Sequence, residues 1–275
     1  MAAKRMRLDA ELVRRNMGDS RERARDLIDG GRVLVNGVVA TKPATQVEPT
    51  TSVALAASDE PEWASRGAHK LLGALDAFAP AGLTVEGRRC LDAGASTGGF
   101  TDVLLARGAE RVEAADVGYG QLVWRLRSDN RVGVHDKTNV RTLTPEAIGG
   151  AVDLVVADLS FISLPLVLPA LAACTRVGGD LLPMVKPQFE VGRDRVGAGG
   201  VVRDPALRHE AVMGVVRSAA EVGLRTEGCV ASPLPGPSGN VEYFLWLRRS
   251  PDAPVHLDPD EMHSLVGSAV RRGPQ

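Results

Sequence analysis

From Gly67 onward the chain alternates short apolar runs with amphipathic segments, and this alternation constrains the fold more than any other feature of the sequence. The apolar runs have the length and residue types of strands: RCLDAG, RVEAADV, RVGVHD, VDLVVADL, DLLPMVKP, TEGCVASP and VEYFLWL. The helix-like segments between them are AHKLLGALDAF, GFTDVLLARG, GQLVWRLRS, PLVLPALAAC and PALRHEAVMGVVRSAAEVG. Strands that alternate with helices form a mostly parallel sheet with helices on both faces. We therefore predict an α/β fold for residues 67–275.

The first 59 residues follow a different pattern, which predicts a separate small domain. Two short helical segments, LDAELVRR and SRERARDLIDGG, come first, and Asp9 is placed to cap the first of them. RVLVNGVVA follows, and its Asn36-Gly37 pair is a strong signal for a β-hairpin turn. The order helix, helix, hairpin predicts a small α+β domain over residues 1–59. Residues 60–66 are then a linker to the α/β domain at 67–275.

Composition excludes several classes of protein. The formal net charge of −1 excludes a globally basic nucleic-acid binder, although a local basic patch is compatible with it. No apolar run approaches the roughly 18 residues that span a bilayer, and the N-terminus lacks the apolar core of a signal peptide. The three cysteines are far apart, and no Cys or His cluster has metal-ligand spacing. We predict a cytoplasmic protein without a structural metal, a membrane association or an obligate protein partner.

The small N-terminal domain is locally basic. From Met1 to Val35 there are nine basic and six acidic residues, so the segment carries 9 − 6 = +3. A solvated surface and an RNA-binding surface both account for this excess. For the second interpretation the candidate RNA-binding residues are Arg5, Arg7, Arg14, Arg15, Arg21 and Arg25.

The stretch LDAGASTGGF joins a predicted strand to a predicted helix with very little side-chain bulk. Ligands of open α/β sheets bind at the carboxyl ends of the strands, and glycines let backbone approach a ligand closely. The stretch is neither the dinucleotide pattern G-x-G-x-x-G nor a P-loop with its lysine. Because it contains Asp92, it suits an uncharged or cationic ligand better than a pyrophosphate. A tight turn without a ligand is the alternative.

This stretch resembles the S-adenosylmethionine (SAM) loop of Rossmann-like methyltransferases. The resemblance implies that Asp92 faces the positively charged methionine end of SAM. It also implies that Asp116, at the end of the next strand, holds the ribose and that Asp136 contacts adenine, although Asp136 could equally be a helix cap. The SAM-binding residues that we expect are Asp92, Gly94, Ser96, Thr97, Gly98, Gly99, Phe100, Asp116 and Asp136.

Four charged residues at the edges of predicted elements complete a second resemblance: Lys70, Asp158, Lys186 and Glu242. They are similar to the catalytic Lys-Asp-Lys-Glu tetrad of FtsJ-like ribose 2′-O-methyltransferases. The N-terminal pattern resembles the S4 RNA-binding domain. The whole chain is similar to the TlyA family, which joins these two domains, in segments such as SRGAHKL, VADLSFISL, VKPQFEVG and SPLPGPSGNVEYFLWL.

The family resemblance implies a substrate and a biological effect. It implies SAM-dependent 2′-O-methylation of cytidines in ribosomal RNA, within the small ribosomal subunit and in some members also the large one. It further implies that the modification sensitises ribosomes to capreomycin and viomycin.

A lysine at position 186 can serve the reaction in two ways. Placing the ribose oxygen in line with an activated methyl group could supply on the order of 7–11 kcal/mol. To act as a base, Lys186 needs a pKa lowered by roughly 3 units from about 10.4. Burial and Lys70 would lower it, whereas Asp158 and Glu242 would oppose the change. Otherwise Lys186 stays an ammonium and stabilises the developing alkoxide electrostatically.

Three other functions compete with ribose methylation. A SAM-dependent methyltransferase acting on an RNA base nitrogen is the first, because ADLSF loosely resembles an amine-gripping loop, but it lacks that loop's two prolines. A membrane-acting haemolysin is the second, since some TlyA relatives carry this label, but no segment of the sequence supports it. A ribosome-assembly factor with an inactive site is the third, and the intact loop and tetrad argue against it.

Overall fold

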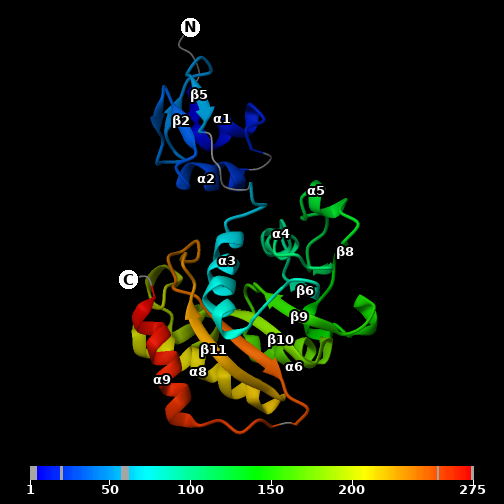
Figure 1. Cartoon of the computed structure of the whole chain (residues 1–275). Coiled ribbons are helices and arrows are strands. Elements are labelled where there is room, and N and C mark those ends of the chain that lie inside the picture. Colours follow the sequence, from blue (N-terminus) through cyan, green and yellow to red (C-terminus); the bar gives the residue numbers. More distant parts are fainter. Residues whose placement is uncertain (1–4, 19–20, 57–61, 253, 274–275) are drawn as a thin grey trace. The chain divides into compact units, whose positions relative to one another are not determined.

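The chain divides into two units, Met1–Arg66 and Gly67–Gln275, in the computed structural model (Figure 1). The structure describes residues 5–18, 21–56, 62–252 and 254–273. The division falls at the end of the predicted linker, whereas the predicted start of the linker at residue 60 lies outside the described residues.

The N-terminal unit contains short helices and strands around a small apolar core. Its elements are β1 (Met6–Arg7), α1 (Leu8–Arg14), α2 (Arg21–Asp29), β2 (Val33–Val35), β3 (Val38–Val39), β4 (Gln46–Val47) and β5 (Val53–Leu55). The predicted hairpin joins β2 to β3, with φ angles of 51° at Asn36 and 81° at Gly37, as its turn requires. The predicted cap was wrong, because α1 begins at Leu8 and Asp9 lies buried inside its first turn.

The larger unit is built on a seven-stranded sheet in the order β11-β12-β10-β9-β6-β7-β8. The strands are β6 (Arg89–Ala93), β7 (Arg111–Ala115), β8 (Val132–His135), β9 (Val152–Ala157), β10 (Thr175–Val185), β11 (Leu224–Ala231) and β12 (Tyr243–Arg249). The pairings from β10 to β8 are parallel, whereas β12 is antiparallel to both β10 and β11. The loop at 232–242 explains this exception, because a parallel crossover needs about a dozen residues or more. The predicted mostly parallel α/β fold is confirmed.

Helices cover both faces of this sheet (Figure 1). They are α3 (Gly67–Phe78), α4 (Gly99–Ala106), α5 (Trp124–Arg127), α6 (Leu168–Cys174), α7 (Pro187–Glu190), α8 (Pro205–Glu221) and α9 (Pro259–Arg272). The side chains of β12 alternate between the faces, as the period of a strand requires. Tyr243 and Leu245 join the core cluster beneath α6, α8 and α9, whereas Phe244 contacts Phe100 of α4 and Trp246 contacts Phe78 of α3.

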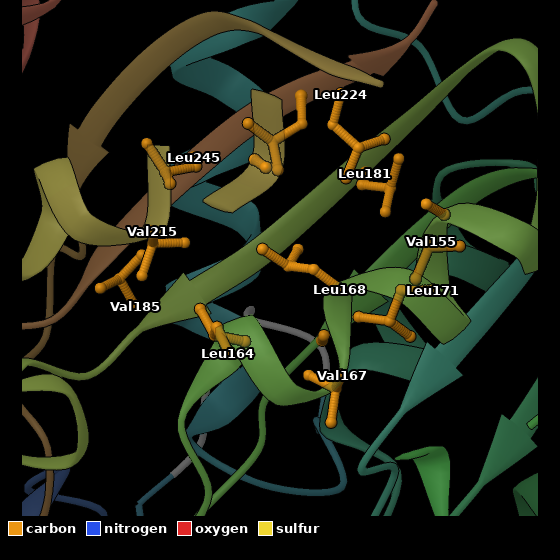
Figure 2. Packing of buried hydrophobic residues seen from close by; sticks show 14 of the residues in the cluster. Val155, Leu164, Val167, Leu168, Leu171, Leu181, Val185, Val215, Leu224 and Leu245 are labelled. Atoms are coloured by element: carbon orange, nitrogen blue, oxygen red, sulfur yellow. The ribbon is translucent and has the colours of Figure 1, made fainter. Parts of the chain in front are cut away.

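The core beneath α6 and α8 anchors the strands whose ends form the site. Figure 2 shows Leu168 and Leu171 of α6 among the side chains of Val155 of β9 and Leu181 of β10. These residues are all nearly inaccessible to solvent, and such close packing leaves the strand ends little freedom to shift. Residues at the carboxyl ends of these strands are therefore presented on a rigid base.

Candidate active site

The glycine-rich stretch and Asp158 lie side by side because β6 and β9 are paired. The parallel register aligns Ala93 with Ala157, and the amide of Asp158 donates to the carbonyl of Ala93 at 3.1 Å. Gly94 follows with φ 88°, and a Cβ placed there would lie 2.5 Å from the carbonyl oxygen of Asp158. The protein's own backbone therefore requires that Gly94 has no side chain.

Asp92 is fully buried beneath this stretch. Its Oδ2 accepts hydrogen bonds from the amide and the hydroxyl of Thr101, at 2.8 and 2.7 Å. Its Oδ1 is buried and has no hydrogen-bond partner among the described residues. Burial raises the pKa of Asp92 to about 7, and the nearby carboxylates of Asp158 and Asp116 act in the same direction.

Asp116 directly follows β7 and remains partly accessible. Its two oxygens accept the amides of Ser96 at 2.9 Å and of Gly118 at 2.7 Å. A carboxylate oxygen can accept more than one hydrogen bond, so Asp116 keeps the capacity to bind hydroxyl groups. This arrangement can hold a sugar at the carboxyl end of β7.

The other predicted cofactor residues divide between the loop and the core. Gly98 and Gly99 form the start of α4, with Gly98 at φ 103°. Phe100 is buried against Phe244, so its ring belongs to the core beneath the stretch. Asp136 follows β8 and forms an ion pair with Arg127 at 2.9 Å, and this contact lowers the pKa of Asp136. Thr97 lies between Ser96 and Gly98, and its carbonyl accepts the amide of Val123 at 3.2 Å.

Three carboxylates therefore surround the glycine-rich stretch: Asp92, Asp116 and Asp158. Burial is the main cause of the raised pKa of Asp92, and the carboxylates of Asp158 and Asp116 add to it. Asp92 and Asp116 therefore place carboxyl oxygens on two sides of the stretch, where they can accept hydrogen bonds from a ligand.

The predicted tetrad comes together as two ion pairs. Lys70 Nζ donates to Glu242 Oε2 at 2.6 Å across 172 positions of sequence. Lys186 Nζ lies 2.6 Å from Asp158 Oδ1. Both lysines are 8% exposed and Glu242 is 1% exposed. Charges this buried are stable only when they are paired, so each lysine depends on its acid.

Strand register explains why these distant residues meet. β10 and β12 are antiparallel with Val185 opposite Tyr243, so Lys186 and Glu242 extend the two strands at the same edge of the sheet. Asp158 ends the neighbouring β9 at that edge. The two ion pairs therefore lie beside the glycine-rich stretch, as the parallel sheet predicted.

Some residues at this edge were not predicted from the sequence. Lys186 Nζ also donates to the hydroxyl of Ser160 at 3.0 Å. The next residue, Phe161, has a φ of 63° and is 91% exposed, with its ring 5.3 Å from that of Phe189. An exposed aromatic residue in the left-handed region is unusual and indicates a functional constraint. The sequence indicated Ser160 and Phe161 only by their position directly after Asp158-Leu159.

Five of the six candidate RNA-binding arginines of the N-terminal unit are held by two buried acids, Asp9 and Glu11. Asp9 is fully buried and accepts hydrogen bonds from Arg7, Arg21 and Arg25, which lower its pKa, Arg7 most strongly. Glu11 likewise holds Arg14 and Arg15, while Arg5 pairs with Glu48. These six arginines face three acids, so the group carries 6 − 3 = +3. A fixed array of partly exposed guanidinium groups can contact several phosphates at once.

Two kinds of feature are absent from the described part of the chain. No three His, Cys, Asp or Glu side chains gather there as a set that could hold a metal ion. Within the same ranges, no helix combines the length and the apolar character that crossing a bilayer requires.

Comparison with known proteins finds a family match for each of the two units of the chain. The FtsJ-like methyltransferase family profile matches residues 63–249, and the S4 domain profile matches residues 6–53. The chain is 59% identical over 272 residues, 99% of its length and 100% of the relative's, to the 16S/23S rRNA (cytidine-2′-O)-methyltransferase TlyA of Mycobacterium tuberculosis. It is 31% identical to the 23S rRNA (cytidine-2′-O)-methyltransferase TlyA of Campylobacter jejuni, over 88% of this chain and 98% of that one.

A solved structure resembles the whole chain. It is a hemolysin-named protein from Streptococcus thermophilus, which is 36% identical, with a TM-score of 0.76 over 98% of this chain and 97% of that one. Sequence, site and overall structure therefore agree, and the chain belongs to the TlyA family, in which an S4 domain precedes an FtsJ-like methyltransferase domain.

Proposed function

We propose that this protein transfers a methyl group from SAM to the ribose 2′-hydroxyl of a cytidine in ribosomal RNA. The observation that carries the proposal is the pair of buried lysine–carboxylate contacts, Lys70–Glu242 and Lys186–Asp158, beside the glycine-rich stretch. The names of the relatives from Mycobacterium tuberculosis and Campylobacter jejuni support the same substrate class.

The residues present fit SAM as the methyl donor. SAM supplies an activated methyl group and carries positive charge at its methionine end. Asp92 Oδ1 is buried close to Gly94 and has no hydrogen-bond partner among the described residues, so it is an acceptor suited to that end of the ligand. Asp116 would accept the ribose hydroxyls, and Asp136 lies at the end of the neighbouring strand for the adenine side.

Lys186 is the residue that we place next to the target oxygen. Its ion pair with Asp158 supports the electrostatic role, in which a fixed cation stabilises negative charge that develops on the oxygen as the methyl group arrives. Asp158 and Ser160 orient the Lys186 side chain. The Lys70–Glu242 pair extends the charged edge and holds α3 against the start of β12.

The N-terminal unit would supply affinity for RNA. Its arginines on Asp9 and Glu11 form a preorganised cationic surface, and phosphate contacts from such residues account for most sequence-independent binding to nucleic acid. We place the substrate within ribosomal subunits on the strength of the relatives' names. Domain limits of 1–59 and 67–275, with a linker between them, remain part of this proposal.

The test is product analysis with purified ribosomal subunits. Full-length protein, methyl-labelled SAM and each subunit are incubated, the RNA is digested to nucleosides, and 2′-O-methylcytidine is quantified. Lys186→Ala should abolish the product, whereas Arg176→Ala should not. Arg176 pairs with Asp153 at the opposite end of the sheet, so it controls for loss of a cation from an ion pair away from the site. If the labelled methyl group were found on a base nitrogen, the result would reject ribose methylation in favour of base methylation.

A further inference from the structure

The segment 158–164, which follows β9, is docked along α7 through three successive contacts. We call it the Asp158 segment. The first contact is made by Lys186, the residue before α7, whose Nζ lies 2.6 Å from Asp158 and donates to Ser160 at 3.0 Å. The position of this segment therefore decides where Asp158 and Ser160 lie relative to the Lys186 ammonium.

The second contact is weak. The rings of Phe161 and Phe189 lie 5.3 Å apart, but Phe161 is 91% exposed and its φ of 63° is unfavourable for a residue with a side chain. A turn that is strained and buries little apolar surface does not hold itself in place. The Asp158 segment must be held by contacts on either side of Phe161.

The third contact provides that support. Glu190, the last residue of α7, accepts the hydroxyl of Ser163 at 2.6 Å through Oε2 and the amide of Leu164 at 2.9 Å through Oε1. Leu164 is 2% exposed and begins a short 3-10 helix, and the hydroxyl of Ser163 does not cap it. A buried amide without an acceptor is unfavourable, so Glu190 takes the place of the missing cap.

We propose that Glu190 is a positioning residue for methyl transfer. By holding Ser163 and Leu164 it fixes the Asp158 segment on α7, and through that segment it sets Asp158 and Ser160 against Lys186. The inference rests on the proposed function, because it assigns Lys186 to the reacting oxygen.

The experiment compares four variants of the full-length protein in single-turnover methyl transfer to ribosomal subunits, with the RNA KM and the SAM affinity measured in parallel. Glu190→Ala should lower the rate constant on the order of 10- to 100-fold, the size of effect expected when a catalytic group is displaced by less than about 1 Å. The RNA KM and SAM affinity should stay unchanged. Glu190→Gln should stay within about threefold of wild type, because its oxygen can accept from Leu164 and its amide can donate to Ser163.

Two further variants control the comparison. A cavity of about 210 Å³ is lined by Ser163, Glu190 and Glu210. Glu210→Ala should behave as wild type, since Glu210 pairs with Arg195 at 2.8 Å, outside the Asp158 segment. Ser163→Ala removes one of the two contacts without leaving an unpaired amide, so it should lower the rate less than Glu190→Ala. If Glu190→Ala does not fold, the rate of Ser163→Ala still tests the positioning role of Glu190.

The outcomes separate this inference from the proposed function. Wild-type rates in both Glu190→Ala and Ser163→Ala would overturn the positioning role, and so would equal losses in Glu190→Gln and Glu190→Ala. The proposed function is judged on a different readout, the chemical identity of the wild-type product. A wild-type product other than 2′-O-methylcytidine would reject that function, while the ratios between variants and wild type would still report on Glu190.

Discussion

The ionisation of Asp92 should make the stability of this protein fall as pH rises through the neutral range. Its pKa is raised from an ordinary value of 3.8 to about 7, because the carboxyl is fully buried and one of its oxygens lacks a partner among the described residues. When the pKa of a carboxyl is higher in the folded than in the unfolded state, the carboxyl contributes stability that is fully present at pH values below the unfolded-state pKa. That contribution is lost as pH rises through the folded value.

The magnitude follows from the shift. A pKa difference of about 3 between the folded and unfolded states corresponds to roughly 4 kcal/mol in the free energy of unfolding. This loss is spread over the pH range between the two pKa values. About half of this, roughly 2 kcal/mol, should be lost between about pH 5.5 and 8. Replacing Asp92 by Asn removes the titration and keeps an oxygen that can accept both hydrogen bonds from Thr101.

The assay is urea unfolding of wild type and Asp92→Asn at both pH values, without SAM. The difference in free energy of unfolding between the two proteins should change by roughly 2 kcal/mol between the pH values, because all other titrations cancel. Parallel pH dependences in the two proteins would show that Asp92 is already ionised at low pH, which would refute the reasoning from burial.

The remaining predictions concern the site and the RNA-binding surface. Lys186→Arg should be as inactive in methyl transfer as Lys186→Ala, because a planar guanidinium places its charge differently, and SAM affinity measured by calorimetry should survive in both. Gly94→Ala should destabilise the protein by at least ~2 kcal/mol, seen as a fall of roughly 4–8 °C in Tm, because of its φ and the nearby Asp158 carbonyl. Arg14→Glu with Arg21→Glu should weaken binding to ribosomal subunits and flatten its dependence on salt, measured by filter binding, without changing SAM affinity. Phe161→Ala should lower methyl transfer and leave Tm unchanged, because the ring is exposed beside Ser160 and buries little surface, and a normal rate would show that the strained conformation of Phe161 has no functional role.

Local patterns in the sequence were sufficient for most of the secondary structure and for the edge of the sheet at which the candidate residues lie. Alternating apolar and amphipathic runs predicted the seven strands of the large sheet, and the Asn36-Gly37 pair predicted the hairpin. These features depend on residues only a few positions apart, so they can be recognised from the sequence alone. The placement of Lys186 and Asp158 at the edge beside Gly94 also followed, since parallel strands carry their carboxyl ends to one edge.

Other features depend on partners that no local pattern identifies. The helix predicted over GQLVWRLRS is a single turn at Trp124–Arg127, and Asp9, predicted as a cap, instead gathers Arg7, Arg21 and Arg25. A short polar side chain near a helix start is compatible with either role. Which role it takes is decided by the cations that the folded chain brings to it.

The charge relationships within the site were decided only by the tertiary structure. The pairing of Lys70 with Glu242 joins residues 172 positions apart, and it depends on α3 packing beside the start of β12. The raised pKa of Asp92 and the hold of Glu190 on Leu164 depend equally on burial and on partners from other elements. The sequence identifies which groups are able to ionise or to accept a hydrogen bond. Burial and nearby charges, which exist only after distant segments have packed, determine whether it does.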